Sequence, residues 1–299
     1  MSDRLSVLPQ YLFPKQALTT FAGFVAGREH GWITTEIIRR FVAKYGVNMH
    51  EAAQPDITAY RTFNDFFTRA LKPGARPLAE AALICPVDGA ISQFGRIEHD
   101  QIFQAKGHRY STTALVGGDA ALAARFDHGS FATLYLSPKD YHRIHMPCDG
   151  QLQQMIYVPG DLFSVNPVTA RGVPGLFARN ERLVCVFESA AGPFVMVLVG
   201  ATIVGSMATV WHGPVVPVRS GGAASRATQL RRWSYGAASS GHSAAVMLRR
   251  GEEMGRFLLG STVVMLFDQT SALAFNPEWT AGRSIRLGEA MAERGVLGR

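Results

Sequence analysis

Short apolar runs recur through the middle of the chain, each bounded by turn residues. The clearest are "FATLYLS" (131–137), "QMIYVPG" (154–160), "RLVCVFES" (182–189) and "FVMVLVG" (194–200). Because these runs are rich in β-branched and aromatic residues and are separated by turns, they predict a mostly antiparallel β domain rather than alternating βαβ units. We expect this β-rich domain to cover residues 71–299, since the pattern changes at "KPGARPL" (72–78).

The first part of the chain has a helical pattern instead. Apolar residues follow helical spacing at Leu18, Phe21, Ala22 and Val25, and again in "TTEIIRRFVAKYG" (34–46). We therefore expect residues 1–70 to be helical and the protein as a whole to be α+β. Residues 1–50 contain six Lys or Arg against three acidic residues, with aromatic residues between them. Such helices lie in a membrane interface or pack on their own domain, and the pattern leaves both open.

Two further segments need an interpretation. The stretch from Ala190 to Val218 contains no Asp, Glu, Lys or Arg and is long enough to resemble a membrane span. Gly and Pro interrupt it, however, and its apolar runs are rich in β-branched residues, so we interpret it as successive core strands. Residues 220–245 are rich in Gly, Ala and Ser around one basic, aromatic patch. We expect them to form a long mobile loop.

Composition and charge narrow the class of partner. The chain is 47% hydrophobic and 18% charged, which suits a folded domain with a substantial core. Its formal net charge of +7 fits nucleic acid or an anionic membrane, although a merely soluble basic protein is the plain alternative. Paired zinc ligands and aromatic-rich RNA-binding motifs are missing from the sequence, which argues against nucleic acid. Three widely separated cysteines and no evident signal peptide indicate a reducing compartment, with the cytoplasm as the default.

The run "RFLLGSTVVMLF" (256–267) predicts a buried strand with two weak points in its middle. Gly260 weakens a strand, and a buried Ser261 needs a hydrogen-bond partner. Because Gly260 has no side chain, the Ser261 hydroxyl can approach the preceding carbonyl carbon. With a histidine to accept its proton and a carboxylate to orient that histidine, Ser261 becomes a nucleophile whose nearest target is its own backbone.

The ester formed by such an N-to-O acyl shift breaks by β-elimination, which cuts the chain. The dehydroalanine left behind hydrolyses to a pyruvoyl group, which is an electron sink much like PLP. A hydrogen-bonded core serine is the simpler interpretation of Ser261.

Other candidate chemistry lies in three segments. "CPVDGAIS" (85–92) places Asp88 at a strand-to-turn junction, and "SPKDYHRIHMPCDG" (137–150) brings together His142, His145 and Cys148. These three side chains are competent zinc ligands, but positions 142 and 145 of a strand point to opposite faces, so ordinary hydrogen-bonded histidines are favoured. "GHSAA" (241–245) lacks the last glycine and the preceding strand of a nucleophile elbow and is treated as a false match.

Taken together, these segments resemble the proteobacterial-type phosphatidylserine decarboxylases along almost the whole chain. The resemblance rests on "YRTFNDFFTRALKPGARPL" (60–78), "CPVDGAISQFGRIE" (85–98), "IFQAKGHRYS" (102–111), "YLSPKDYHRIHMPCDG" (135–150), "MIYVPGDLFSVN" (155–166), "LFARNERLVC" (176–185), "VGATIVGSMATVW" (199–211) and "GEEMGRFLLGST" (251–262). In 220–245 only "RRWSY" fits the family pattern, and after Phe267 mainly "SIRLGEAMA" (284–292) does.

The resemblance implies a set of site residues. The self-processing L-G-S-T motif falls on 259–262, so the chain is expected to be cut between Gly260 and Ser261 and to carry a covalent pyruvoyl cofactor at 261. The charge-relay aspartate and histidine fall on Asp88 and His145. His142 matches a histidine associated with decarboxylation, and we assign it to orienting the substrate carboxylate or to delivering a proton. No metal is implied.

The implied reaction converts phosphatidylserine to phosphatidylethanolamine and CO₂ through a Schiff base between substrate and the pyruvoyl group. The implied architecture is an N-terminal helical, membrane-associated region (1–70) followed by the β-rich catalytic domain (71–299). We expect large and small chains from one precursor, a homodimer, and a peripheral location on the cytoplasmic side of the cell membrane, with phosphatidylserine in an anionic bilayer as partner. Two rivals use the same residues: a lipid hydrolase with a Ser261–His145–Asp88 triad, and a non-enzymatic protein that binds membrane surfaces.

Overall fold

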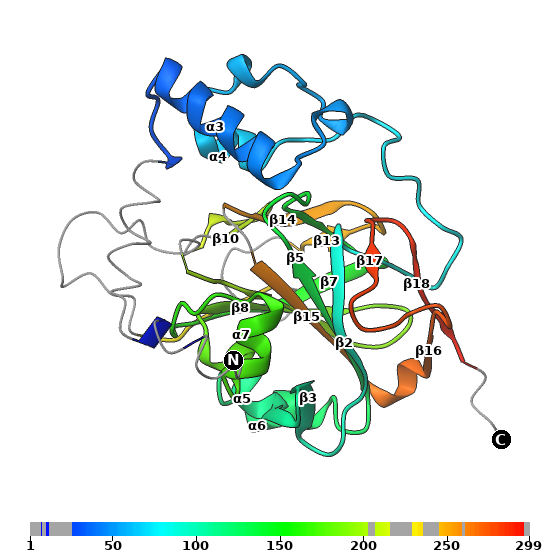
Figure 1. Cartoon of the computed structure of the whole chain (residues 1–299). Coiled ribbons are helices and arrows are strands. Elements are labelled where there is room, and N and C mark those ends of the chain that lie inside the picture. The colour runs from blue at the N-terminus through cyan, green and yellow to red at the C-terminus, as the bar shows by residue number, and fades with distance from the viewer. Residues whose placement is uncertain are drawn as a thin grey trace.

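The apolar runs form the strands of one large antiparallel sheet (Figure 1). The computed structural model describes residues 7, 10–11, 26–202, 207–215, 229–235, 245–258 and 261–295, with only the backbone of Ser261. Within these ranges the largest sheet has the order β12 (Arg231–Ser234), β7 (Gly150–Val158), β8 (Arg182–Glu188), β9 (Phe194–Val199), β15 (Ser261–Phe267), β5 (Ser130–Leu136), β2 (Gly89–Arg96) and β17 (Ser284–Ile285), and β13 (Met247–Leu248) also pairs with β7.

Smaller sheets and short helices surround this sheet. The sheets are β11 (Gly213–Pro214), β10 (Met207–Thr209), β14 (Glu253–Phe257) and β6 (Arg143–His145); β1 (Leu83–Ile84), β18 (Ala290–Arg294) and β16 (Leu273–Phe275); and β3 (Gln101–Ala105) with β4 (His108–Ser111). The helices are α3 (Trp32–Tyr45), α4 (Phe63–Phe67), α5 (Thr112–Leu115), α6 (Ala120–Ala124), α7 (Pro167–Gly172) and α8 (Leu176–Arg179), with 3-10 turns at Met49–Glu51, Ile57–Ala59 and Gln269–Ser271. The prediction of an α+β fold with mostly antiparallel strands is confirmed.

The large sheet is buried on both faces, which explains why its strands read as continuous apolar runs. Alternate residues of β15 enter different cores: Val263 and Met265 belong to one cluster, and Val264 and Leu266 belong to the other. Residues of β6, β10 and β14 complete the first cluster, and residues of α5 to α8 complete the second. The sheet is therefore the middle layer between a smaller sheet and a layer of helices.

The helical prediction for residues 1–70 is confirmed where the structure describes that region. Helix α3 ends at Gly46, which adopts the left-handed conformation (φ 67°) and donates its N–H to the Val42 carbonyl at 2.9 Å. Helix α4 begins at a capping box in which Thr62 and Asp65 bond each other's backbone N–H groups. The two helices share a small core of their own. The predicted helical pattern around residues 18–25 lies outside the described residues.

The interpretation of the 190–218 stretch as strands is confirmed for β9 and β10. None of the described helices is long and apolar enough to cross a membrane. The interpretation of residues 220–245 as one long loop is wrong for 231–234, which form β12 on the edge of β7. The cause is visible in the alternation of side chains, because Trp233 and Tyr235 pack against the core whereas Arg232 and Ser234 are exposed. The rest of that predicted loop, apart from 229–235 and Ala245, lies outside the described residues.

Candidate functional site

One end of the large sheet brings the sequence-predicted residues together. Because β2, β5 and β15 are antiparallel neighbours, the starts of β2 and β15 lie beside the end of β5. Ser261 pairs with Leu136, the last residue of β5, and Ala90 pairs with the preceding Tyr135. Asp88 directly precedes β2 and the histidine segment follows β5, so both lie near the start of β15. Leu259 and Gly260, which precede that start, lie outside the described residues.

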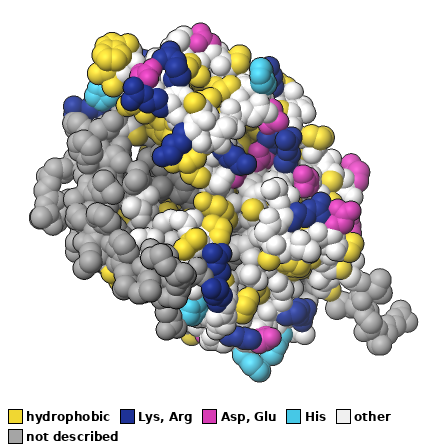
Figure 2. Space-filling model, in the orientation of Figure 1, with side chains coloured by type: hydrophobic (Ala, Val, Ile, Leu, Met, Phe, Trp, Pro, Cys, Tyr) yellow, Lys and Arg dark blue, Asp and Glu magenta, His cyan; other side chains and the backbone are white. Residues whose placement is uncertain are grey.

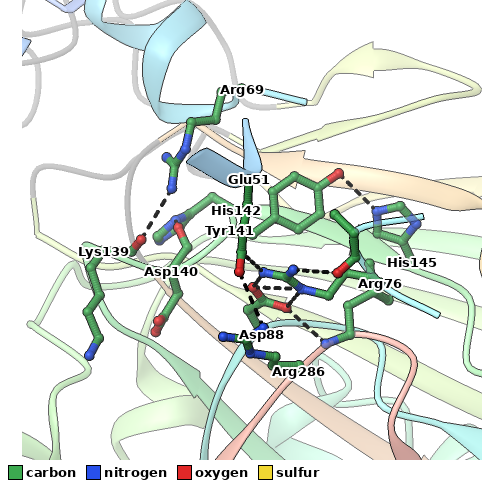
Figure 3. A network of polar contacts seen from close by, with 12 residues as sticks. Glu51, Arg69, Arg76, Asp88, Lys139, Asp140, Tyr141, His142, His145 and Arg286 are labelled. Atoms are coloured by element: carbon green, nitrogen blue, oxygen red, sulfur yellow. Dashed lines mark hydrogen bonds and ion pairs between the residues drawn. The ribbon is translucent and has the colours of Figure 1, made fainter. Parts of the chain in front are cut away.

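Asp88 is buried and is held by an arginine that the sequence analysis did not single out. Arg76 places its Nε at 2.9 Å and 3.2 Å from the two carboxylate oxygens of Asp88 and its Nη2 at 2.5 Å from Oδ2 (Figure 3). The backbone N–H of Leu287 donates to Asp88 Oδ1 at 2.9 Å. Arg76 also contacts Glu51 at 2.6 Å, and Glu51 contacts Arg286 at 3.3 Å. The side-chain hydrogen bond to Asp88 is the main cause that raises the pKa of Arg76 above its ordinary value. The guanidinium therefore stays charged.

His145 lies on the segment next to Asp88. Its backbone N–H donates to the carbonyl of Pro86 at 2.9 Å. The ring Nδ1 lies 2.8 Å from the Gly251 carbonyl oxygen, and Nε2 lies 3.2 Å from the Tyr141 hydroxyl. Burial lowers the pKa of His145, while the Gly251 carbonyl and the charge of Asp88 act in the opposite direction. Among the described contacts His145 and Asp88 interact through their charges and not through a hydrogen bond.

His142 is fully buried behind this site. Its ring centroid lies 4.0 Å from that of Phe67, and its Nδ1 lies 2.8 Å from the Asp140 carbonyl oxygen. Burial lowers the pKa of His142 to about 3, so the ring is neutral at physiological pH. The other nitrogen, Nε2, has no hydrogen-bond partner in the part of the chain that the structure describes. A buried nitrogen of this kind is costly unless a bound group completes it.

A cleft of about 300 Å³ opens next to these residues. Its lining includes Lys72, Arg76, Tyr141, Arg143, His145 and Glu253. Arg143 bonds the Glu253 carboxylate at 2.8 Å and the Thr68 carbonyl oxygen at 2.8 Å, which joins the segment after α4 to β6 and β14. The cleft therefore lies between the segment after α4 and the small sheet that contains β6 and β14, and both apolar and charged groups line it.

The structure does not gather the residues considered for zinc. Within the described residues, no group of three or more His, Cys, Asp or Glu side chains is arranged to hold a metal ion. His142 is buried against Phe67, whereas His145 lines the cleft, so their rings have separate surroundings. The "GHSAA" segment lies outside the described residues except for Ala245.

Sequence reasoning missed Arg76, Glu51, Tyr141 and Arg69. Arg76 and Arg69 lie in "TRALKPGARPL" (68–78), where the sequence pattern changes from helical to β-rich. Tyr141 lies between Asp140 and His142, and its residue type indicates neither a metal ligand nor a base. Their contacts join positions far apart in the chain, and no local spacing marks such contacts.

Comparisons with known proteins agree with the resemblance. Residues 63–293 match the family model described as phosphatidylserine decarboxylase, and residues 5–46 match a second model described as PSD. The curated relatives include the phosphatidylserine decarboxylase proenzyme of Polaromonas naphthalenivorans (strain CJ2), 76% identical over 293 residues with 98% of each chain covered. The proenzymes of Polaromonas sp. (strain JS666) and Variovorax paradoxus (strain S110) are 77% and 75% identical over 292 residues, covering 98% of this chain and 99% and 98% of theirs.

Proposed function

Because the chain belongs to the phosphatidylserine decarboxylase family, we propose that it converts phosphatidylserine to phosphatidylethanolamine and CO₂. The observation that carries this proposal is the match over nearly the full length to several relatives named as proenzymes of that activity. The cleft supports it, because the candidate base His145 and Arg76, which binds Asp88, both line that cleft.

The chain is proposed to cut itself between Gly260 and Ser261 and to keep a pyruvoyl group at position 261. A pyruvoyl carbonyl supplies an electrophile for the substrate amine and a sink for the electron pair left when CO₂ departs. The surroundings suit such a group, because the start of β15 is enclosed by strands and a buried, unpartnered nitrogen of His142 lies nearby. The two resulting chains, 1–260 and 261–299, remain partners in one folded molecule through β15.

The roles of three side chains follow from their surroundings. His145 is assigned to accept the Ser261 proton during self-cleavage, and the nearby negative charge of Asp88 favours the protonated ring. Asp88 is held by hydrogen bonds from Arg76 and from the Leu287 N–H, which fixes the position of a carboxylate that acts through its charge. His142 is assigned to the substrate step, where its neutral ring orients the carboxylate or delivers a proton.

The helical region is proposed to rest on an anionic membrane at the cytoplasmic side of the cell membrane. Helix α3 exposes Trp32 (78%), Ile33 (44%) and Ile37 (37%), and Arg39 and Arg40 lie on the same helix. Figure 2 shows hydrophobic and Lys or Arg side chains side by side at the top, over the region of α3 in Figure 1. Exposed aromatic and basic side chains favour an anionic bilayer surface. Sedimentation with anionic but not neutral vesicles, reduced in Trp32→Ser, would support this location.

The experiment that tests the chemistry is intact-mass analysis of the purified protein with an assay of CO₂ release from phosphatidylserine. We expect two chains, a carbonyl-reactive group on the smaller one, and inhibition by hydroxylamine. Ser261→Ala is expected to remain a single, inactive chain. An active protein that consists of one unmodified chain would refute the proposal. Light scattering of the detergent-solubilised protein tests the proposed homodimer in the same preparation.

The rival lipid hydrolase uses Ser261, His145 and Asp88 on an external ester. It predicts fatty-acid release, no self-cleavage and no sensitivity to hydroxylamine. The non-enzymatic rival predicts that His145→Ala changes no activity. Neither rival accounts for the unpartnered His142 nitrogen, and the same mass and product measurements separate all three.

A further inference from the structure

Arg69 is a buried cation that lacks a carboxylate partner among the described residues, and its guanidinium lies over the Phe66 ring, 5.3 Å from the ring centroid. The residue is 4% exposed and directly follows α4, and its Nη2 donates to the Lys139 carbonyl oxygen at 3.2 Å. Its Nε and Nη1 are buried and have no hydrogen-bond partner. Arg69 makes no ion pair with any described residue. A guanidinium in this state is costly unless an anion completes it.

The two neighbouring carboxylates, Asp88 and Asp140, form no hydrogen bond or ion pair with Arg69 among the described contacts. Asp140 accepts the N–H and hydroxyl of Ser137 at 2.7 Å and 2.8 Å through the same oxygen. Asp88 is bound by Arg76. Arg69 interacts with Asp88 and Asp140 only at longer range, through their charges.

A second buried arginine gives a useful contrast. Arg182 is 3% exposed and also lacks a carboxylate partner. Its Nε, Nη1 and Nη2 nevertheless donate to the carbonyl oxygens of Leu115, Asn180 and Ala114 at 2.6 Å, 2.8 Å and 2.5 Å. Backbone acceptors therefore satisfy every nitrogen of Arg182, as expected for a structural arginine, whereas two of the three nitrogens of Arg69 are left unused.

Arg69 lies close enough to His142 for its charge to act on the imidazole ring. The charge of Arg69 helps to lower the pKa of His142, and Figure 3 shows the Arg69 side chain descending toward Lys139 with His142 next to it. Ala70 and Leu71, which follow Arg69, line the cleft, as do Tyr141 and Arg143, which flank His142 in the chain. Chain neighbours of both incomplete groups therefore line the cleft.

We propose that Arg69 binds the phosphodiester of the phospholipid headgroup, with its Nε and Nη1 donating to the phosphate oxygens. This inference rests on the proposed function and adds the residue that recognises the substrate's anionic linkage. A headgroup in the cleft reaches the guanidinium after a local shift of the side chains of the wall. Arginine offers paired donors that match phosphate oxygens, which a lysine cannot reproduce.

The substrate carries a second anion, its carboxylate, but the chemistry favours the phosphodiester for Arg69. The carboxylate loses its charge as CO₂ departs, so a strong ion pair to it would stabilise the starting state and slow the reaction. The phosphodiester keeps its charge throughout, and binding it lowers KM without cost to kcat. Phosphatidylethanolamine, the product, retains the phosphodiester and lacks the carboxylate, which allows an experiment to separate the two anions.

The experiment compares Arg69→Lys and Arg69→Met with wild type in detergent micelles that contain phosphatidylserine. We expect Arg69→Met to raise KM about 10- to 100-fold with kcat nearly unchanged, as for loss of a hydrogen bond to a charged group. Arg69→Lys is expected to fall between Arg69→Met and wild type. The inhibition constant of phosphatidylethanolamine should rise by the same factor as KM. Arg182→Lys is the matched control, and its KM should stay within about twofold of wild type.

Each outcome decides the matter. Unchanged KM in both Arg69 variants would refute the inference, and a changed KM with unchanged phosphatidylethanolamine inhibition would assign Arg69 to the carboxylate instead. If the Arg69 variants do not self-cleave, phosphatidylethanolamine binding is measured in the single-chain Ser261→Ala background, where Arg69→Met should weaken it and an unchanged affinity overturns the inference. A wild-type protein that releases no CO₂ would refute the proposed function, which is a separate result.

Discussion

Removing Arg76 should destabilise the fold strongly, because the change leaves a buried carboxylate without its cation. The side chains of Arg76 and Asp88 are only 8% and 11% exposed, so solvent screens their interaction little. Breaking a buried pair by removing one partner costs about 3–5 kcal/mol, since the other charge stays buried. The Leu287 N–H still bonds Asp88 in such a variant, so we expect the lower part of that range for Arg76→Met.

Urea unfolding followed by tryptophan fluorescence measures this loss, with every variant made in the single-chain Ser261→Ala background. Arg109→Met is the control, because the Arg109–Glu98 pair is 44% and 64% exposed and such pairs contribute about 0–1 kcal/mol. In the double variant Arg76→Met with Asp88→Asn the buried Asp88 carboxylate is gone and Glu51 keeps Arg286, so the loss should be smaller than the sum of the two single losses. A loss below about 1 kcal/mol for Arg76→Met, or additive losses, would contradict the reasoning.

Three more results are expected. Burial lowers the pKa of His142 to about 3 and also lowers that of His145, so their neutral forms stabilise the fold fully above their ordinary pKa of 6.5, and that stability is lost as pH falls toward 3. Between about pH 6 and 4, His142→Gln should reduce the slope of the unfolding free energy against pH by about 1.4 kcal/mol per pH unit. An unchanged slope would show that His142 does not contribute to this pH dependence. Gly89→Ala should lower the free energy of unfolding by about 1–3 kcal/mol and slow self-cleavage, because the added Cβ would lie 2.3 Å from the Tyr135 carbonyl oxygen. Self-cleavage at the wild-type rate would contradict this prediction. Tyr141→Phe removes the hydroxyl that lies 3.2 Å from His145 Nε2 and should slow self-cleavage, followed on gels, by roughly tenfold. An unchanged rate would show that this contact does not contribute to self-cleavage.

The sequence predicts the sheet well because burial leaves a local trace. Val263 to Leu266 are apolar without a break, since alternate residues enter two different cores, and the turn residues around such runs mark the strand ends. The N-terminal helix ends at Gly46 as its glycine indicates. The edge strand β12 was missed because only Trp233 and Tyr235 reach the core, which is too short a pattern to distinguish from a loop.

The site is harder to predict than the fold. Motif resemblance names Asp88, His142 and His145, and the strand order brings their segments to one sheet end. The resemblance assigns Asp88 and His145 to one charge relay, and it does not indicate that Asp88 is bound to Arg76 or that the Tyr141 hydroxyl lies 3.2 Å from His145 Nε2. Long-range ion pairs and orphaned donors depend on how distant segments pack, so they carry no periodicity in the sequence.

Strand β15 lies between β9 and β5, at the centre of the largest sheet. The proposed cut at its first residue would make the middle of that sheet the start of a separate short chain, held by its neighbours. Refolding after full unfolding would then be an encounter between two molecules, so it would depend on protein concentration in a way that refolding of the uncut chain does not. Assembly of the sheet is therefore faster while the chain is continuous, and dilution after denaturation should slow the recovery of the cut protein.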